Sequence, residues 1–341
     1  MRLTAAAGLL AAAIGLGTTT AALAQPAADT VATIRQRGNL ICGVAPSTVG
    51  FSNPDSRGEW RGLDVDTCRA VAAAILGDAT KVRFVPASTQ QRFTMLQSGE
   101  IDMLSRSTTW TLGREASLGL AFAGVNFYDG QGFMVRRSSG VTSARQLDGA
   151  TVCVQPGTTT ELNMADFFRT NSLRYTPIVI DNIEELRQAF ISGRCDAYTN
   201  DASSLASFAA SQGPNMSQYL LLPEIISKEP LGPVVRKGDW RFFDIVRWSL
   251  FAQVTAEELG ITSQNLAQFQ DSNNPDVQRF MGRSGDLGRQ MGINNDFAVQ
   301  IVRQVGNFAE MWDRNITPIG IQRGINALWS KGGLQYAPPM R

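Results

Sequence analysis

RFTMLQSGEIDMLSRST (residues 92–108) repeats the pattern of ELRQAFISGRCDAYTND (residues 185–201), and this repeat decides the fold. In both stretches, apolar residues at helical spacing lead to Ser-Gly, and the short apolar strand that follows ends in polar residues. An apolar strand and a turn with proline and hydroxyl side chains precede each copy, as LICGVAPST (40–48) and TVCVQPGTT (151–159). The chain therefore runs strand, helix, strand twice over.

Two such units predict an α/β fold with two lobes. Alternating strands and helices are typical of a doubly wound parallel sheet, and such sheets bind ligands beyond the carboxyl ends of their strands. Two lobes that face each other would bring the polar residues after these strands into a shared cleft, namely 45–53, 105–114, 155–161 and 200–204. The hydroxyl-rich stretch SRSTTWT would then lie beside the ligand.

The N-terminus predicts export. Residues 1–24 contain Arg2, an apolar run over 5–16 and an Ala-Leu-Ala cleavage site at 22–24, which is the pattern of a secretory signal peptide. The apolar run is too short for a comfortable membrane span, and no later stretch reaches the length that a span requires. We therefore expect an exported, soluble chain.

The composition restricts the function classes. The chain has no histidine, which excludes Ser-His-Asp and Cys-His catalysis and histidine-based metal sites. It has 31 basic and 30 acidic residues without a basic block, which argues against nucleic-acid binding. We therefore expect neither a metal, nor a cofactor, nor a nucleic-acid partner.

The four cysteines permit three disulfide pairings. Export favours disulfides over a zinc or redox site, and no CxxC pair is present. Cys42 and Cys68 fall in the first lobe and Cys153 and Cys195 in the second, so we expect pairing within each lobe, which leaves the lobes free to move. The alternative is four buried, apolar cysteines.

Six stretches in a fixed order narrow the prediction further: GEWRGLDVDTCRAVAAAILGD, LQSGEID, STTWTLGRE, DGQGFMVRR, CVQPGTTTELN and SGRCDAYTND. From about Asn39 onward the chain resembles the periplasmic solute-binding proteins of polar amino-acid ABC transporters. The longer stretches STTWTLGREASLGLAFAGVNFYDGQGFMVR and EIISKEPLGPVVRKGDWRFFDIVRW, with NALWSKGGLQYAPPMR, are similar to the general L-amino-acid binding proteins within that group.

This resemblance implies a two-lobe periplasmic binding protein fold, with two doubly wound sheets joined by two crossover segments. FYDGQGFMVRR (127–137) and EPLGPVVRKGD (229–239) match the crossovers. Lobe 1 is then expected at 25–130 plus 235–341, including a C-terminal helical extension without an evident chemical role, and lobe 2 at 135–230.

The implied function is capture of free L-amino acids in the periplasm and their delivery to ABC transporter permease subunits in the inner membrane. A monomer without catalytic residues is expected. An envelope enzyme on the same fold, such as a dehydratase, is one alternative, although the absence of histidine leaves few groups for general acid–base work. A non-transport amino-acid sensor is another, and the residues alone do not separate it from a transport protein.

The resemblance also implies a ligand set. Ser107 and Thr109 precede Arg114 by seven and five residues, as do the family's carboxylate- and ammonium-contacting positions, and the guanidinium fork of Arg114 suits a carboxylate. Thr159 matches a threonine at a helix start that faces the carboxylate, and Asp201 matches the acid that binds the ammonium group. Alternatively, Arg114 is a surface residue and Asp201 caps the next helix.

Side-chain specificity depends on the loop after the first strand and on Thr89. Relatives selective for basic amino acids place an acid in that loop, whereas GVAPSTVGFSN (43–53) has none. Thr89 stands where relatives often have an aromatic wall, unless it only caps the following helix. The resemblance therefore implies a broad pocket for neutral and acidic polar amino acids.

Overall fold

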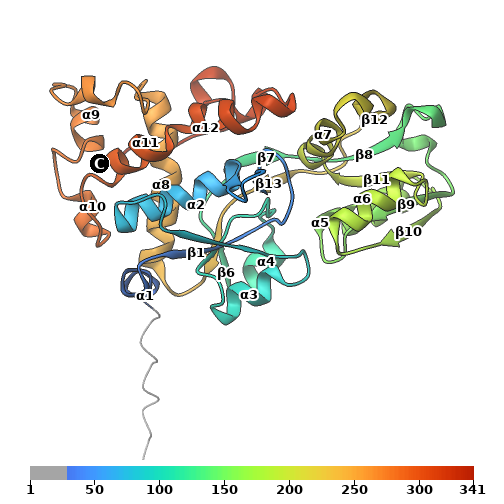
Figure 1. The fold of residues 1–341 in the computed structure, drawn as a ribbon, viewed down its shortest axis with the longest axis horizontal. Coiled ribbons are helices and arrows are strands. Elements are labelled where there is room, and N and C mark those ends of the chain that lie inside the picture. The colour runs from blue at the N-terminus through green and yellow to red at the C-terminus, as the bar shows by residue number, and fades with distance from the viewer. Residues whose placement is uncertain (1–28) are drawn as a thin grey trace, which may run out of the picture.

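The computed structural model describes residues 29–341, so the expected signal peptide at 1–24 lies outside the described residues. The chain forms two lobes, each built around a five-stranded sheet (Figure 1). Within 29–341, no helix combines the length and the apolar character needed to cross a membrane.

Lobe 1 contains the first sheet, whose strand order is β4-β1-β5-β14-β6. Its strands are β1 (Leu40–Val44), β4 (Val82–Pro86), β5 (Met103–Leu104), β6 (Leu120–Phe122) and β14 (Val234–Arg236). The helices before residue 120 are α1 (Thr30–Arg37), α2 (Leu63–Leu76), α3 (Arg92–Ser98) and α4 (Leu112–Ser117), and a hairpin of β2 (Asn53–Pro54) and β3 (Trp60–Arg61) precedes α2.

Lobe 2 contains the second sheet, whose order β10-β9-β11-β8-β12 repeats that of the first. Its strands are β8 (Gln131–Arg136), β9 (Ala150–Val154), β10 (Tyr175–Val179), β11 (Ala197–Asp201) and β12 (Tyr219–Leu221). Its helices are α5 (Thr159–Thr170), α6 (Ile183–Ile191) and α7 (Ala202–Ser211). Buried apolar clusters cover both faces of this sheet.

Both sheets are mixed, whereas the repeat predicted parallel sheets. The strands of the repeat do pair in parallel, β1 with β4 and β5, and β9 with β10 and β11. β8 and β14 run antiparallel to their neighbours. The reason is the direction of the chain: the parallel strands end at the cleft, while β8 and β14 begin at the connection between the lobes and lead away from it.

The crossover segments are shorter than expected. β7 (Phe127–Asp129) and β13 (Glu229–Leu231) form a two-stranded antiparallel sheet between the lobes (Figure 1). The residues after them already belong to the lobe sheets, as β8 and β14. Lobe 2 therefore begins at Gln131, four residues before the expected boundary at 135, because β8 completes its sheet.

Glycine ends the first helix of each repeat where the pattern predicted a stop. Gly99 follows α3 and has φ +83°, and Gly193 lies just beyond α6 with φ +84°. Residues with a Cβ rarely adopt this left-handed conformation, so glycine turns the chain into the next strand at little cost.

The two disulfides lie within the lobes. Cys42 on β1 pairs with Cys68 on α2, and Cys153 on β9 pairs with Cys195, which precedes β11. All four cysteine side chains are fully buried. Each bridge fastens a strand to another part of its own lobe, and neither one restricts the connection between the lobes.

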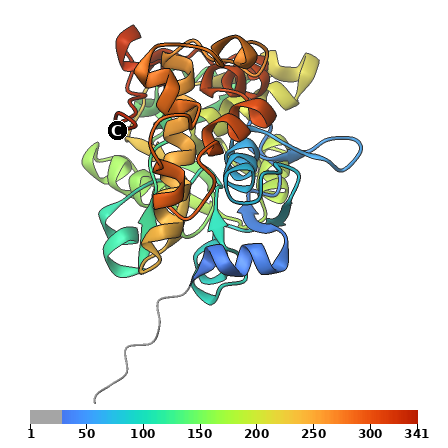
Figure 2. The same ribbon diagram turned by 90° about the vertical axis from the view of Figure 1, so that its left-hand side faces the viewer.

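The C-terminal extension completes lobe 1. It contains α8 (Trp240–Glu258), α9 (Pro275–Phe280), α10 (Leu287–Gln290), α11 (Phe297–Val305) and α12 (Phe308–Asn315). α8 and α11 pack against α2, and residues of the extension share one apolar core with lobe 1. Figure 2 shows these orange and red segments gathered at the lobe 1 end of the molecule.

The extension also contacts the connection between the lobes. Trp312 on α12 stacks on Phe127 of β7, with ring centroids 5.3 Å apart. Asn326 accepts a 2.7 Å hydrogen bond from the backbone N–H of Tyr128 and donates a 2.9 Å bond to its carbonyl. The extension therefore has a structural role that the sequence did not reveal, since it pins one of the two connecting strands.

Candidate functional site

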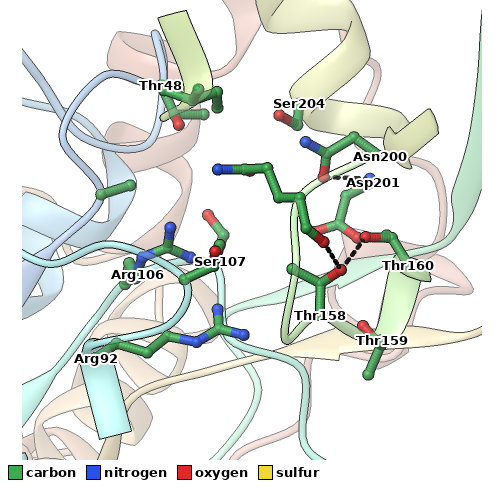
Figure 3. A pocket seen from close by; sticks show the side chains of 14 residues that line it. Thr48, Arg92, Arg106, Ser107, Thr158, Thr159, Thr160, Asn200, Asp201 and Ser204 are labelled. Carbon is green, nitrogen blue, oxygen red and sulfur yellow. Dashed lines mark hydrogen bonds between the residues drawn. The ribbon is translucent and has the colours of Figure 1, made fainter. Parts of the chain in front are cut away.

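A pocket lies between the lobes at the carboxyl ends of the parallel strands (Figure 3). The space between its side chains, solvent included, is about 490 Å³. Lobe 1 contributes Ala45, Thr48, Thr89, Arg92, Arg106 and Ser107, and lobe 2 contributes Gln155, Thr158, Thr159, Thr160, Ile183, Asn200, Asp201 and Ser204. The pocket thus stands where the strand and helix pattern predicted it.

Asp201, the last residue of β11, presents a buried carboxylate to the pocket. Its exposed fraction is 8%, and within residues 29–341 no group donates a hydrogen bond to its side-chain oxygens. It stands at the N-cap position of α7, but its side chain makes no capping bond there. Burial, followed by the nearby carboxylates of Asp129 and Glu229, raises the pKa of Asp201 well above its usual value. Asp201 is therefore available to a cationic ligand group.

Arg92 and Arg106 face Asp201 from the opposite wall (Figure 3). Their exposed fractions are 3% and 7%, and neither takes part in any ion pair of the described chain. Burial lowers the pKa of Arg92 well below its usual value and lowers that of Arg106 to about 10. Buried charges are normally paired, so two such guanidinium groups call for a carboxylate from outside the protein.

Ser107 is held in place by Asp64 at the start of α2. The Asp64 carboxylate accepts bonds of 2.8 and 3.0 Å from the backbone N–H and the hydroxyl of Ser107, and a 3.0 Å bond from Ser105. Ser107 has φ +44°, a conformation that costs energy for a residue other than glycine. Burial raises the pKa of Asp64. These bonds fix a strained turn at the edge of the pocket.

Thr109 and Thr159 meet at Glu229, a buried residue of the connecting strand β13. Their hydroxyls donate to Glu229 Oε2 over 2.6 and 2.9 Å. Arg114 lies behind Thr109, donates from Nη1 to its carbonyl oxygen at 2.8 Å, and packs over the ring of Phe93. Burial lowers the pKa of Arg114, while the charges of Glu229 and Asp201 act in the opposite direction.

The two walls also contact each other directly. Thr89 donates a 2.7 Å hydrogen bond to Asp181 of lobe 2, so it does not cap α3, whose N-cap is Gln91. Arg92 donates to the carbonyl of Gly157 at 3.4 Å. The buried Arg187 on α6 reaches the carbonyl of Ser47 in lobe 1 at 3.2 Å.

The structure brings four of the six expected ligand residues to the pocket wall: Thr89, Ser107, Thr159 and Asp201. Thr109 and Arg114 lie just behind it, at the end nearest the connecting strands. The sequence reasoning missed Arg92 and Arg106, because an arginine at the start of a helix or inside a polar turn is usually exposed. Their burial was the only signal, and it depends on the assembled fold. Within 29–341, no cluster of three metal-binding side chains is found.

Comparison with known proteins finds relatives that match most of the chain. A family model described as bacterial extracellular solute-binding proteins, family 3, matches residues 40–265. The general L-amino acid-binding periplasmic protein AapJ of Rhizobium johnstonii is 50% identical over 338 residues, which cover 98% of this chain and 99% of that protein. The glutamate/glutamine/aspartate/asparagine-binding protein BztA of Rhodobacter capsulatus is 53% identical over 318 residues, which cover 92% of this chain and 94% of that protein.

A solved structure shows the same fold. It is an ABC transporter periplasmic binding protein from Brucella ovis with glutathione bound, 52% identical in sequence. The superposition has a TM-score of 0.90 and covers 92% of this chain and 100% of that chain.

Proposed function

Because the chain belongs to the bacterial extracellular solute-binding proteins of family 3, we propose that it captures free L-amino acids between its lobes and delivers them to an ABC permease. The proposal includes a periplasmic location, removal of the signal peptide, and action as a monomer. It assigns the chain no catalytic role. The charged side chains at the pocket support this proposal, because they match the charged groups of an amino acid.

One observation carries the proposal. Within residues 29–341, a buried carboxylate that accepts no hydrogen bond from a side chain or the backbone faces two buried guanidinium groups that form no ion pair. Asp201 lies on one wall, and Arg92 and Arg106 lie on the other (Figure 3). An acidic amino acid supplies both missing partners, because its ammonium group can pair with Asp201 and its side-chain carboxylate with the two arginines. A neutral sugar or a purely anionic ligand would satisfy only part of this arrangement.

The α-carboxylate is assigned to Arg114 and to the start of α5. The guanidinium group of Arg114 uses one nitrogen for the Thr109 carbonyl, and its remaining nitrogens have no acceptor in the described chain. The N–H groups of Thr159 and Thr160 likewise make no hydrogen bond within residues 29–341, and the helix dipole favours an anion there. The ammonium group is assigned to Asp201.

Arg92 and Arg106 are assigned to the ligand side chain. They make the lobe 1 wall strongly positive, and Asp201 is the only acid among the pocket-lining residues of the described chain. A basic side chain would meet like charge there, whereas a carboxylate or amide would be attracted. The pocket should therefore prefer acidic and amide side chains, as the name of BztA states for that protein.

A γ-glutamyl peptide is the second candidate ligand. The Brucella ovis protein is described with glutathione bound, and glutathione has a free α-amino acid group at its γ-glutamyl end. The same charges would hold that end, while Thr48, Asn200 and Ser204 offer further polar contacts along the pocket. A peptide and a free amino acid would thus share the arrangement around Asp201.

Calorimetric titration of the mature protein, unfolded and refolded to remove bound ligand, tests the proposal. The panel should contain the twenty L-amino acids and glutathione. We expect the tightest binding for glutamate, aspartate and their amides, and weak binding for arginine and lysine. Tight binding of arginine, or of no amino acid at all, would contradict the assignment.

Chromatography of the released ligand separates binding from catalysis. A binding protein returns the amino acid unchanged, whereas a dehydratase or a related enzyme would release a product. Uptake of labelled glutamate into vesicles that contain the permease, with and without this protein, separates transport from sensing.

A further inference from the structure

Glu229 contacts residues from three parts of the molecule, namely lobe 1, lobe 2 and the segment that leads into β13. It lies on the connecting strand β13 and has an exposed fraction of 1%. Its Oε2 accepts from Thr109 of lobe 1 at 2.6 Å and from Thr159 of lobe 2 at 2.9 Å. Its Oε1 accepts from Asn163 on α5 at 2.8 Å and from Ser227 at 2.6 Å. Four hydrogen-bond donors thus converge on the two carboxylate oxygens of Glu229.

The hydroxyl groups of Thr109 and Thr159 therefore have only acceptor capacity left for further hydrogen bonds. A hydroxyl has one hydrogen to donate and two lone pairs that accept. Both hydrogens are committed to the same oxygen of Glu229, although the two hydroxyl oxygens lie only 3.3 Å apart. The lone pairs that remain offer acceptors to a ligand, and Thr159 lines the pocket.

Other negative charge surrounds the same end of the pocket. Asp129 on β7 stands directly opposite Glu229 in the two-stranded sheet, and both carboxylates lie close enough to Asp201 to disfavour its charged form. Acceptor hydroxyls beside these carboxylates match an ammonium group and repel a carboxylate. The backbone N–H groups at the start of α5 remain the donors for the α-carboxylate.

We propose that Glu229 is a positioning residue for ligand selection: by taking both threonine protons, it leaves the Thr159 hydroxyl at the pocket wall, with Thr109 behind it, as an acceptor for the ligand ammonium group. Glu229 itself does not touch the ligand. It sets the preference for α-amino ligands over carboxylates of the same length that lack the amine. This inference rests on the proposed amino-acid site and adds to it the residue that decides the direction of the hydroxyl bonds.

The test compares L-glutamate with glutarate, which has the same two carboxylates and no ammonium group. Affinities are measured by calorimetry for the parent protein, Glu229→Gln and Glu229→Met. The amide can donate to the threonines and the thioether is a poor acceptor, so both variants free the hydroxyls to donate. We expect the ratio of glutamate to glutarate affinity to fall about tenfold or more in both.

Ser227→Ala is the matched control, because it removes a donor from Glu229 Oε1 and leaves the threonine bonds to Oε2 intact. We expect the affinity ratio of this variant to stay within about twofold of the parent. Thr159→Val tests the same point without altering Glu229 and should also lower the ratio, whereas Thr159→Ser should restore it. This pair of variants tests whether the Thr159 hydroxyl selects the ligand amine even if the Glu229 variants do not fold.

The outcomes separate the inference from the proposed function. A parent protein that does not prefer glutamate to glutarate would contradict the amino-acid site and the inference together. A parent that prefers glutamate, with Glu229 or Thr159→Val variants that lose affinity for both ligands equally, would overturn only the inference. Glu229 would then have only a structural role, as an acceptor that holds the two lobes together.

Discussion

Thr89 of lobe 1 donates a hydrogen bond of 2.7 Å to the Asp181 carboxylate of lobe 2. The bond joins residues 92 positions apart and closes one side of the pocket. Because this contact needs no ligand, it contributes to the free energy of the closed arrangement whichever amino acid is bound. A ligand that touches both walls adds to it, so closure and binding should be coupled.

Thr89→Val should weaken binding of all ligands by a similar factor, about 10-fold, because a hydrogen bond to a charged group is lost from the closed form alone. Thr89→Ser keeps the hydroxyl and should bind like the parent. Calorimetry gives the affinities, and small-angle scattering of ligand-free protein should give a larger radius of gyration for the valine variant. A change in the ranking of ligands without a common loss would favour the sequence-based view that Thr89 shapes specificity.

Asp201→Asn should weaken every α-amino ligand by roughly 30-fold to several thousand-fold, because the ammonium group would lose its buried counter-charge. Asp166→Asn, on the exposed face of α5, is the control and should bind like the parent. Binding within a few-fold of the parent in Asp201→Asn would mean that the ammonium group binds elsewhere.

Ligand binding to the parent should release protons. Burial and neighbouring carboxylates raise the pKa of the free Asp201 well above its usual value, and a bound ammonium group lowers it again. Affinity should therefore rise with pH through the pKa of free Asp201 and level off above it. Calorimetry in buffers of different ionisation enthalpy measures the proton release, and proton uptake instead would reverse the assignment.

Arg114→Ala and Arg92→Met should show which arginine binds the α-carboxylate of glutamate and which binds its side-chain carboxylate. Loss of Arg114 should reduce the affinity for all amino acids alike, by roughly 30-fold or more, since all share the α-carboxylate. Loss of Arg92 should reduce the affinity for glutamate far more than that for glutamine. Thermal melting must first show that each variant folds. Near-parental binding by Arg114→Ala would make its bond to Thr109 merely structural.

Asp129 should make the stability of the protein fall as the pH rises. Burial and the charge of Glu229 raise the pKa of Asp129 from 3.8 to about 6, and Asp201 faces the same cluster. Between these two pKa values, the folded state therefore holds a proton that the unfolded state has lost. The resulting stabilisation is complete below the unfolded pKa and disappears as the pH rises through the folded pKa. Relative to the parent, Asp129→Asn should gain roughly 2 to 3 kcal/mol of unfolding free energy between about pH 4 and about pH 8. Urea unfolding at both pH values measures the gain, and a constant difference would contradict it.

The disulfide of lobe 2 should contribute strongly to stability. Cys153 and Cys195 are separated by 42 residues, and restriction of the unfolded chain predicts that removing the bond costs about 4 kcal/mol. The double variant Cys153→Ala, Cys195→Ala should show this loss in urea unfolding while the affinity for glutamate stays close to that of the parent. Peptide mapping without reduction should recover the two intra-lobe pairs, and a link between lobes would contradict the structure.

The sequence by itself determined the architecture, because the signals that specify it are local. Apolar spacing defined the strands and helices, Gly99 and Gly193 marked the turns, and the order of the elements implied two lobes with a shared cleft. The same order placed each cysteine with its partner, since the two members of each pair belong to one lobe. The strand order placed residues 200–204 at the cleft, and the family resemblance indicated Asp201 among them as a ligand residue.

Only the tertiary structure decided which polar groups are buried and what they bind. Arg92 and Arg106 carry no local mark of burial, and the pairing of Glu229 with Thr109 joins residues 120 positions apart. The direction of β8 and β14 depends in the same way on where the chain enters each lobe. Burial and hydrogen-bond partners are properties of the assembled surfaces, so the charges that select a ligand appear only after the lobes have formed and met.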